Sequence, residues 1–205
     1  MKKLNTHKAL IIFTRNPILG KVKTRLAKSV GNEIALEIYQ FLLNKTKEVT
    51  LNIPADKVVF YSEEITNKDI WDATIYKKEL QEGTDLGAKM SNAFKTCFKD
   101  GYEKVVLIGS DLFDLEEFHI REAFEKLEKN DAVIGPALDG GYYLLGLKKM
   151  HPTIFMNKNW GTATVRKNTI KNLEKVNVHL LPILNDVDVI EDIKHHPAFT
   201  KFLSP

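Results

Sequence analysis

The sequence predicts an α/β protein in which a mostly parallel central sheet is covered by helices on both faces. Short continuous apolar runs, such as residues 9–13 and 105–108, are typical of strands buried on both sides. Segments with apolar residues three or four positions apart alternate with these runs, as crossover helices do. No repeat, low-complexity tract or linker interrupts the 205 residues, so we expect one domain over residues 1–205.

The expected elements follow from these patterns in chain order. Strands are expected at residues 9–13, 57–62, 73–76, 104–111, 131–136, 142–147 and 178–181. Helices are expected from residues 31–33, 86 and 160 onward. Another helix is expected after Asp114, because Asp114 and Glu117 have the spacing of a capping box. We therefore assign Asp114 to helix capping rather than to chemistry.

A loop dense in cations follows the first strand. It carries Arg15, Lys21, Lys23 and Arg25. Gly20 supplies the backbone freedom that lets these cations converge, and a cluster at the carboxyl end of a buried strand favours an anion such as phosphate. The loop is not a Walker-type phosphate loop, because Arg15 and Val22 stand where that motif needs Gly and Ser or Thr. The alternative interpretation is a solvated surface loop.

Carboxylates follow several of the expected strands. They are Asp111, Asp139 and the pair Asp186 and Asp188. Carboxylate oxygens are the ligands that Mg²⁺ and Mn²⁺ prefer, and a metal ion would make these acids compatible with a bound phosphate. Each Asp taken alone is more simply explained as a turn or cap residue, and it is the set that points to a metal site.

The composition limits the classes of partner. The 30 basic and 27 acidic residues are interspersed and give a formal charge of +3, so nucleic acid is not an expected partner. The single cysteine, Cys97, lies on the apolar face of the helix that starts at Leu86 and is expected to pack as a small hydrophobe. No apolar run is long enough for a signal sequence or a membrane span, so we expect a soluble, cytoplasmic protein.

The motifs, taken in order, resemble a known family. They are Phe13-Thr14-Arg15-Asn16-Pro17, Gly20, Lys23-Thr24-Arg25-Leu26, Gly83-x-Asp85-Leu86-Gly87, Gly109-Ser110-Asp111, Gly135-Pro136, Asp139-Gly140-Gly141-Tyr142, Trp160 and Asp186-Val187-Asp188. The family is the bacterial glycosyltransferase-A-like family named for its association with radical-SAM and selenodomain proteins. It is grouped with nucleotide-diphospho-sugar transferases and is similar to the guanylyltransferases of coenzyme F420 and molybdopterin-cofactor synthesis.

The resemblance implies a glycosyltransferase-A fold and a site for a nucleotide. It assigns the nucleotide and its phosphates to Arg15, Gly20, Lys23, Arg25, Asp85 and Gly87. It assigns the acceptor side to Gly140, Gly141, Tyr142 and Trp160. Asp111 and Asp188 are the expected metal contacts for Mg²⁺ or Mn²⁺, and Asp111 and Asp139 the expected catalytic residues, with Asp139 as the acceptor-orienting base.

The sequence departs from the family in two respects. Leu112-Phe113 replaces the Cys-Pro that usually follows the metal Asp, and the Asp-x-Asp metal signature of many glycosyltransferases is absent. We expect Asp111 to keep its position, since losing Pro changes mainly the local turn.

The functional hypothesis is a transferase acting on a small-molecule acceptor. The first version is a glycosyltransferase with a nucleotide-diphospho-sugar donor, which releases a nucleoside diphosphate. The alternative is a nucleotidyltransferase with a nucleoside triphosphate donor, which releases pyrophosphate. Two further classes stay open, a non-catalytic nucleotide-binding sensor and a structural interaction domain.

Overall fold

The computed structural model describes residues 7–203. In chain order its elements are β1 (Lys8–Thr14), α1 (Thr24–Val30), α2 (Asn32–Leu51), β2 (Asp56–Tyr61), β3 (Tyr76–Leu80), α3 (Leu86–Lys99), β4 (Lys104–Ile108), α4 (Glu117–Lys126), β5 (Ala132–Pro136), β6 (Tyr142–Leu147), η1 (Pro152–Phe155), α5 (Val165–Asn172), β7 (Val178–Leu180), η2 (Ile190–Asp192), η3 (Pro197–Phe199) and α6 (Thr200–Leu203). No helix in this part of the chain combines the length and the apolar character that crossing a membrane requires.

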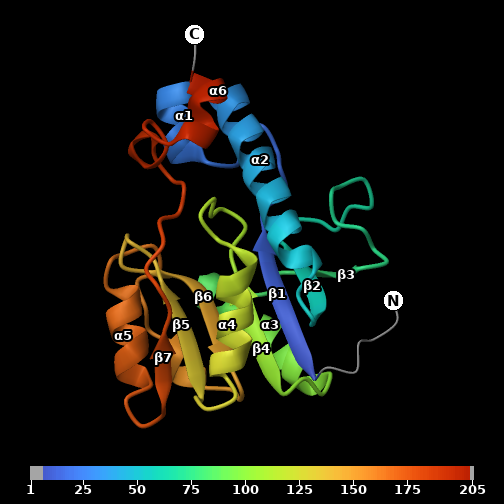
Figure 1. Ribbon diagram of the computed structural model, residues 1–205, viewed down its shortest axis with the longest axis vertical. Coiled ribbons are helices and arrows are strands. Elements are labelled where there is room, and N and C mark those ends of the chain that lie inside the picture. The colour runs from blue at the N-terminus through green and yellow to red at the C-terminus, as the bar shows by residue number, and fades with distance from the viewer. Residues whose placement is uncertain (1–6, 204–205) are drawn as a thin grey trace.

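A central sheet of seven strands in the order β3-β2-β1-β4-β6-β5-β7 organises residues 7–203. β6 runs antiparallel to β4 and β5, and the other neighbouring strands pair in parallel. This confirms the expected mostly parallel α/β architecture. Because six strands point the same way, the segments that follow them meet at one edge of the sheet, which we call the carboxyl edge (Figure 1).

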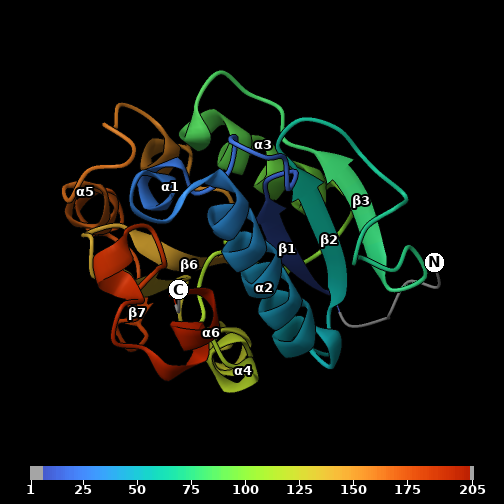
Figure 2. The same cartoon turned by 90° about the horizontal axis from the view of Figure 1, so that it is seen from above.

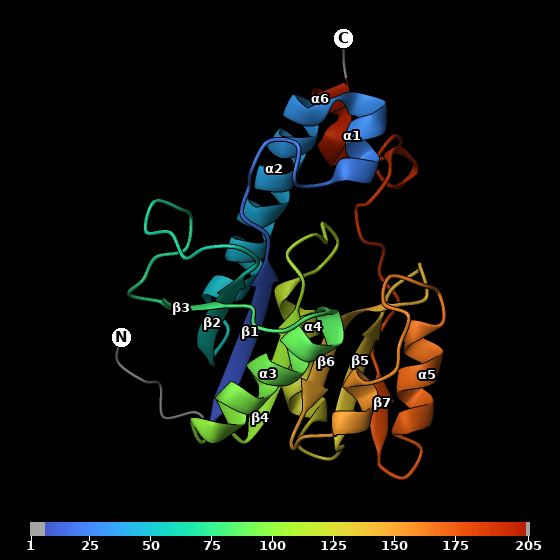
Figure 3. The ribbon, with the colours of Figure 1, turned by 180° about the vertical axis from the view of Figure 1, so that it is seen from behind.

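Helices cover both faces of the sheet. Alternate residues of β1 point to opposite faces: Leu10 and Ile12 pack with α2 and α4, whereas Ala9 and Ile11 pack with α3 and η1. The view from behind shows α3 lying across the second face (Figure 3). Cys97 of α3 is buried in this second cluster, as predicted.

A third apolar cluster lies above the carboxyl edge. It joins α1, α2 and the segment that follows β7. Its buried residues are Leu26, Ile38, Leu42, Val187, Ile193 and Phe199. Figure 1 shows α1, the beginning of α2 and α6 gathered at this end of the molecule. The segment that follows β7 is thereby anchored against α1 and α2.

Several boundaries differ from the sequence prediction. The strand expected at 73–76 begins only at Tyr76, because residues 72–75 form a turn in which the Asp72 carboxylate accepts hydrogen bonds from Thr74. Part of the expected basic loop is helix α1. The helix expected from Trp160 starts at Val165. Leu86, expected in the core, is 42% exposed because it is the first residue of α3.

The prediction that Asp114 caps a helix is wrong. α4 begins at Glu117, so Glu116 occupies the cap position, and its amide donates to His119 Nδ1 at 3.0 Å. Asp114 lies before the cap and 3.6 Å from His196 Nε2. The capping pair is therefore Glu116 and His119, two residues further along the chain than the predicted pair Asp114 and Glu117. A histidine takes the place in which Glu or Gln is usual.

Candidate functional site

The candidate site lies at the carboxyl edge, where β1 and β4 are neighbours. The helical connection after β1 leads to β2 on one side, and the helical connection after β4 leads to β5 on the other side. Such a point of reversal is where open α/β sheets bind ligands. The basic loop starts from β1 and Asp111 follows β4, so both expected halves of the site converge here.

Lys23 and Asp111 form the centre of this arrangement. Lys23 Nζ donates to Asp111 Oδ2 at 3.0 Å, and the Lys23 side chain is only 7% exposed whereas that of Asp111 is 41% exposed. Lys23 also has a left-handed backbone, with φ 46° and ψ 42°, immediately before α1. Left-handed geometry is costly for a residue with a Cβ and is often retained at functional sites.

A second ion pair joins the loop to the C-terminal segment. Arg25 Nη1 donates to Asp188 Oδ2 at 2.7 Å, with both side chains well exposed. The Val187 amide donates to the Asp111 carbonyl at 3.1 Å, which holds this segment against the residue after β4. Asp192 fixes the segment further by accepting from the amides of Asp188 and Val189 at 2.8 Å.

A partly buried carboxyl group, that of Asp186, lies among these charges. Burial, followed by the negative charges of Asp111 and Asp139, raises the pKa of Asp186 to about 6. The carboxylates after β4, β5 and β7 are therefore close enough to repel one another. Excess negative charge of this kind is what a divalent cation relieves.

The metal-binding role expected for Asp111 and Asp188 stays a prediction. Among residues 7–203 no group of three or more His, Cys, Asp or Glu side chains is arranged as a complete cage. Mg²⁺ typically uses one or two carboxylates and completes its coordination with water and phosphate oxygens. The carboxylates of Asp111 and Asp188, which are 41% and 39% exposed, would suit that mode.

The turn between β5 and β6 is built by Asp139 and two glycines. Asp139 Oδ1 accepts from the Gly141 amide at 2.7 Å. Gly140 has φ +89°, and a Cβ placed there would lie 2.5 Å from the Ala163 carbonyl oxygen. Asp139 therefore has a structural role in the turn, and its predicted role as a base stays a prediction.

Trp160, whose acceptor-binding role stays a prediction, packs against α3. A Cβ on Gly87 would lie 2.5 Å from the Trp160 ring and 2.3 Å from the Phe155 carbonyl oxygen, so only glycine permits this packing. Asp85 caps the same helix by accepting from the Ala88 amide at 2.8 Å. Asp85 and Gly87 thus position α3, and nucleotide contact remains a prediction for both.

The remaining predicted residues divide between the site and the core. Arg15 is exposed at the end of β1, and Gly20 has φ +75° in the turn that follows. Tyr142 is directed into the core instead, since its hydroxyl lies 3.9 Å from Met90 Sδ beneath α3. The acceptor contact expected for Tyr142 stays a prediction.

Sequence reasoning gave no role to Tyr39, whose hydroxyl is buried between the ends of β1 and β4. It lies on the apolar face of a helix, where a tyrosine looks like ordinary core. Asp192 was also missed, because its effect on Asp188 depends on a turn that the sequence pattern does not indicate.

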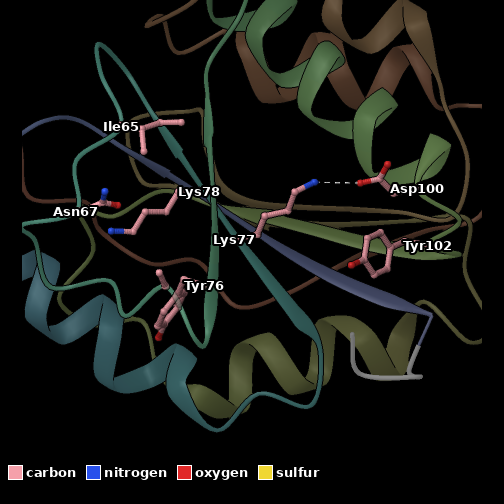
Figure 4. A pocket seen from close by; sticks show the side chains of 8 residues that line it. Ile65, Asn67, Tyr76, Lys77, Lys78, Asp100 and Tyr102 are labelled. Carbon is pink, nitrogen blue, oxygen red and sulfur yellow. Dashed lines mark hydrogen bonds and ion pairs between the residues drawn. The ribbon is translucent and has the colours of Figure 1, made fainter. Parts of the chain in front are cut away.

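A pocket of about 560 Å³ lies away from this site, against edge strand β3 (Figure 4). Its lining includes Lys77 and Lys78. Lys77 pairs with Glu79 and Asp100, and Lys78 pairs with Asp69. None of the predicted site residues lines this pocket, so we assign it no ligand.

Two curated relatives are guanylyltransferases. The 2-phospho-L-lactate guanylyltransferase of Methanocaldococcus vulcanius is 29% identical over 142 residues, which are 68% of this chain and 61% of the relative. That of Methanocaldococcus jannaschii is 31% identical over 145 residues, 69% of this chain and 60% of the relative. The match thus spans about three fifths of the length of these relatives.

A solved structure agrees over nearly the whole chain. The crystal structure of a candidate nucleotide-diphospho-sugar transferase from Desulfovibrio desulfuricans G20 is 32% identical, with a TM-score of 0.85 over 95% of this chain and 90% of that chain. The expected nucleotide-diphospho-sugar transferase fold is therefore confirmed. Residues 45–162 match the family model described as "Uncharacterized protein conserved in bacteria (DUF2064)". The chain belongs to this DUF2064 family.

Proposed function

We propose that this protein is a nucleotidyltransferase that transfers a nucleoside monophosphate from a nucleoside triphosphate to a small acceptor. The observation that carries the proposal is the convergence of the basic loop after β1 with Asp111 after β4, joined by the contact between Lys23 and Asp111. Cations and a carboxylate in one place suit a metal-bound polyphosphate. The similarity to two guanylyltransferases supports nucleotidyl transfer over the glycosyl transfer first expected from the motifs.

The proposed reaction is a displacement at the α-phosphorus. An acceptor oxygen forms a bond to this phosphorus, the bond to the oxygen bridging the α- and β-phosphates breaks, and pyrophosphate leaves. Lys23, Arg25 and Arg15 are the proposed phosphate contacts. Asp111 and Asp188 would hold Mg²⁺ or Mn²⁺, which would neutralise charge on the phosphate oxygens and the leaving group.

The acceptor is proposed to approach from the turn between β5 and β6. Gly140 of this turn packs against the backbone of Ala163, three residues after Trp160, and Trp160 itself packs against Gly87 of α3. The named substrate of the relatives makes 2-phospho-L-lactate the first acceptor to test and GTP the first donor. A single domain over residues 1–205 and an association with radical-SAM proteins remain proposals.

A donor panel tests the proposal. Pyrophosphate release is measured with each common nucleoside triphosphate and Mg²⁺ or Mn²⁺, with and without 2-phospho-L-lactate. We expect acceptor-dependent pyrophosphate from one triphosphate and its loss in Asp111→Asn. Release of a nucleoside diphosphate from a nucleotide sugar would support the glycosyl alternative. Binding of a nucleotide without turnover across a broad set of acceptors would favour a sensor.

A further inference from the structure

The hydroxyl of Tyr39 lies at the junction of three elements. Tyr39 belongs to α2, which crosses over β1 (Figure 2), and its side chain is only 2% exposed. The hydroxyl accepts from the Arg15 amide at 2.8 Å and lies 3.2 Å from the Arg15 carbonyl oxygen. It is also 3.3 Å from Thr14 Oγ1 and 3.2 Å from Ser110 Oγ.

This network joins the two halves of the candidate site. Arg15 is the first cation of the basic loop, and Ser110 directly precedes Asp111. Ser110 Oγ also donates to Thr14 Oγ1 at 3.4 Å, so the ends of β1 and β4 are linked through hydroxyl groups as well as through the sheet. The pairing between β1 and β4 stops before these residues, since Ile12 and Ile108 are the last pair of that ladder.

We propose that Tyr39 is a positioning residue that fixes the basic loop relative to Asp111, so that cations and carboxylate engage one nucleotide together. This inference rests on the proposed function. The phenol does not touch the ligand; it acts through the Arg15 backbone and through Ser110. A hydroxyl suits this place because it can accept one hydrogen bond and donate another. Burial also raises the pKa of Tyr39, which keeps the phenol protonated and able to donate.

A second buried tyrosine provides a matched control. Tyr76 is 1% exposed, and its hydroxyl lies 3.0 Å from Thr50 Oγ1. Thr50 lies near the end of α2, the helix that carries Tyr39. Tyr39→Phe and Tyr76→Phe each remove one buried phenol oxygen that hydrogen-bonds a threonine, but only Tyr39 lies beneath the site. A general loss of packing or stability should therefore appear in both variants.

The experiment compares the wild type, Tyr39→Phe and Tyr76→Phe by calorimetric titration with GTP and with CTP, each with Mg²⁺ and no acceptor. Thermal unfolding of each protein is measured in parallel. We expect both variants to lose similar stability, whereas only Tyr39→Phe weakens nucleotide binding, by about tenfold, the scale of one hydrogen bond. Ser110→Ala should weaken binding in the same direction, and it replaces Tyr39→Phe if that variant does not fold.

The outcomes separate this inference from the proposed function. Equal affinities in Tyr39→Phe and Tyr76→Phe, with a wild type that binds nucleotide, overturn the inference alone. A wild type that binds neither GTP nor CTP with Mg²⁺, and that releases no pyrophosphate from any triphosphate, overturns the proposed function and this inference with it. A selective loss in Tyr39→Phe supports both.

Discussion

Lys23 Nζ lies 3.0 Å from Asp111 Oδ2, so the loop after β1 and the residue after β4 neutralise each other across the sheet edge. Arg25 Nη1 and Asp188 Oδ2 form a second ion pair, at 2.7 Å. Two of the three predicted phosphate-binding cations, Lys23 and Arg25, thus each face a predicted metal-binding carboxylate. A metal-bound polyphosphate satisfies both members of each pair, because its oxygens accept from the cations while its metal binds the acids.

Replacing Lys23 by alanine should weaken nucleotide binding. A charge-assisted phosphate contact contributes about 1.5 to 3 kcal/mol, which corresponds to roughly tenfold to a hundredfold in affinity. Calorimetric titration with GTP and Mg²⁺ measures the change. Lys28→Ala is the control, since it removes the same charge from an exposed position on α1. Equal affinities in the two variants would contradict the assignment of Lys23.

Replacing Asp186 by asparagine should stabilise the protein in EDTA at neutral pH. Burial and the charges of Asp111 and Asp139 disfavour the ionised form of this carboxyl group. Removing its charge should raise the free energy of unfolding by on the order of 1 kcal/mol, because partial exposure screens part of the repulsion. Urea denaturation measures this gain. Asp192→Asn serves as comparison and should destabilise, because Asp192 accepts from two backbone amides. A less stable Asp186→Asn protein would show that the repulsion is unimportant.

His119 should make the protein sensitive to mild acid. Burial lowers the pKa of His119 from its ordinary value of 6.5, and its Nδ1 accepts from the Glu116 amide only when neutral. His119 therefore binds a proton more readily in the unfolded chain than in the folded one. The stabilisation that neutral His119 contributes is complete above pH 6.5 and is lost as the pH falls through the folded-state pKa. His119→Gln should flatten this part of the profile of unfolding free energy against pH, whereas His195→Gln, at an exposed position, should not. Parallel profiles for wild type and His119→Gln would show that His119 does not cause the acid sensitivity.

The glycine at position 140 should be far less replaceable than the glycine at 161. Both have positive φ, +89° and +78°, so alanine costs about 1 to 2 kcal/mol at either position. Only at Gly140 would the new Cβ meet backbone, 2.5 Å from the Ala163 oxygen, which adds about 1 to 3 kcal/mol. Thermal unfolding of Gly140→Ala and Gly161→Ala compares them directly. Equal losses of stability in the two variants would mean that the backbone at Ala163 shifts at little energetic cost.

The fold was largely predictable because buried strands leave a strong local signal. Continuous apolar runs located β1, β4 and β5, and their alternation with helical patterns predicted the mostly parallel sheet. Boundaries were less predictable where side chains decide them, as at Asp72, which forms a turn before β3, and at His119, which takes part in the cap of α4.

The site was predictable as a set of strand-end residues, and its pairings were not. Sequence order places Lys23 and Asp111 after strands that can be neighbours, but their contact spans 88 positions and depends on the order of strands in the sheet. Tyr39 was missed for a related reason: its helical spacing is that of a core residue, and only the packed structure reveals what its hydroxyl contacts.

Following the α- and the γ-phosphorus of GTP into the reaction products tests the central claim most directly. GTP carrying radioactive phosphorus at either the α- or the γ-position is incubated with the protein, Mg²⁺ and 2-phospho-L-lactate, and the products are separated. Nucleotidyl transfer predicts that the α-label enters the acceptor product while the γ-label appears in pyrophosphate, and that Asp111→Asn abolishes both. Transfer of the γ-label to the acceptor, or pyrophosphate formation that Asp111→Asn leaves unchanged, would contradict the account.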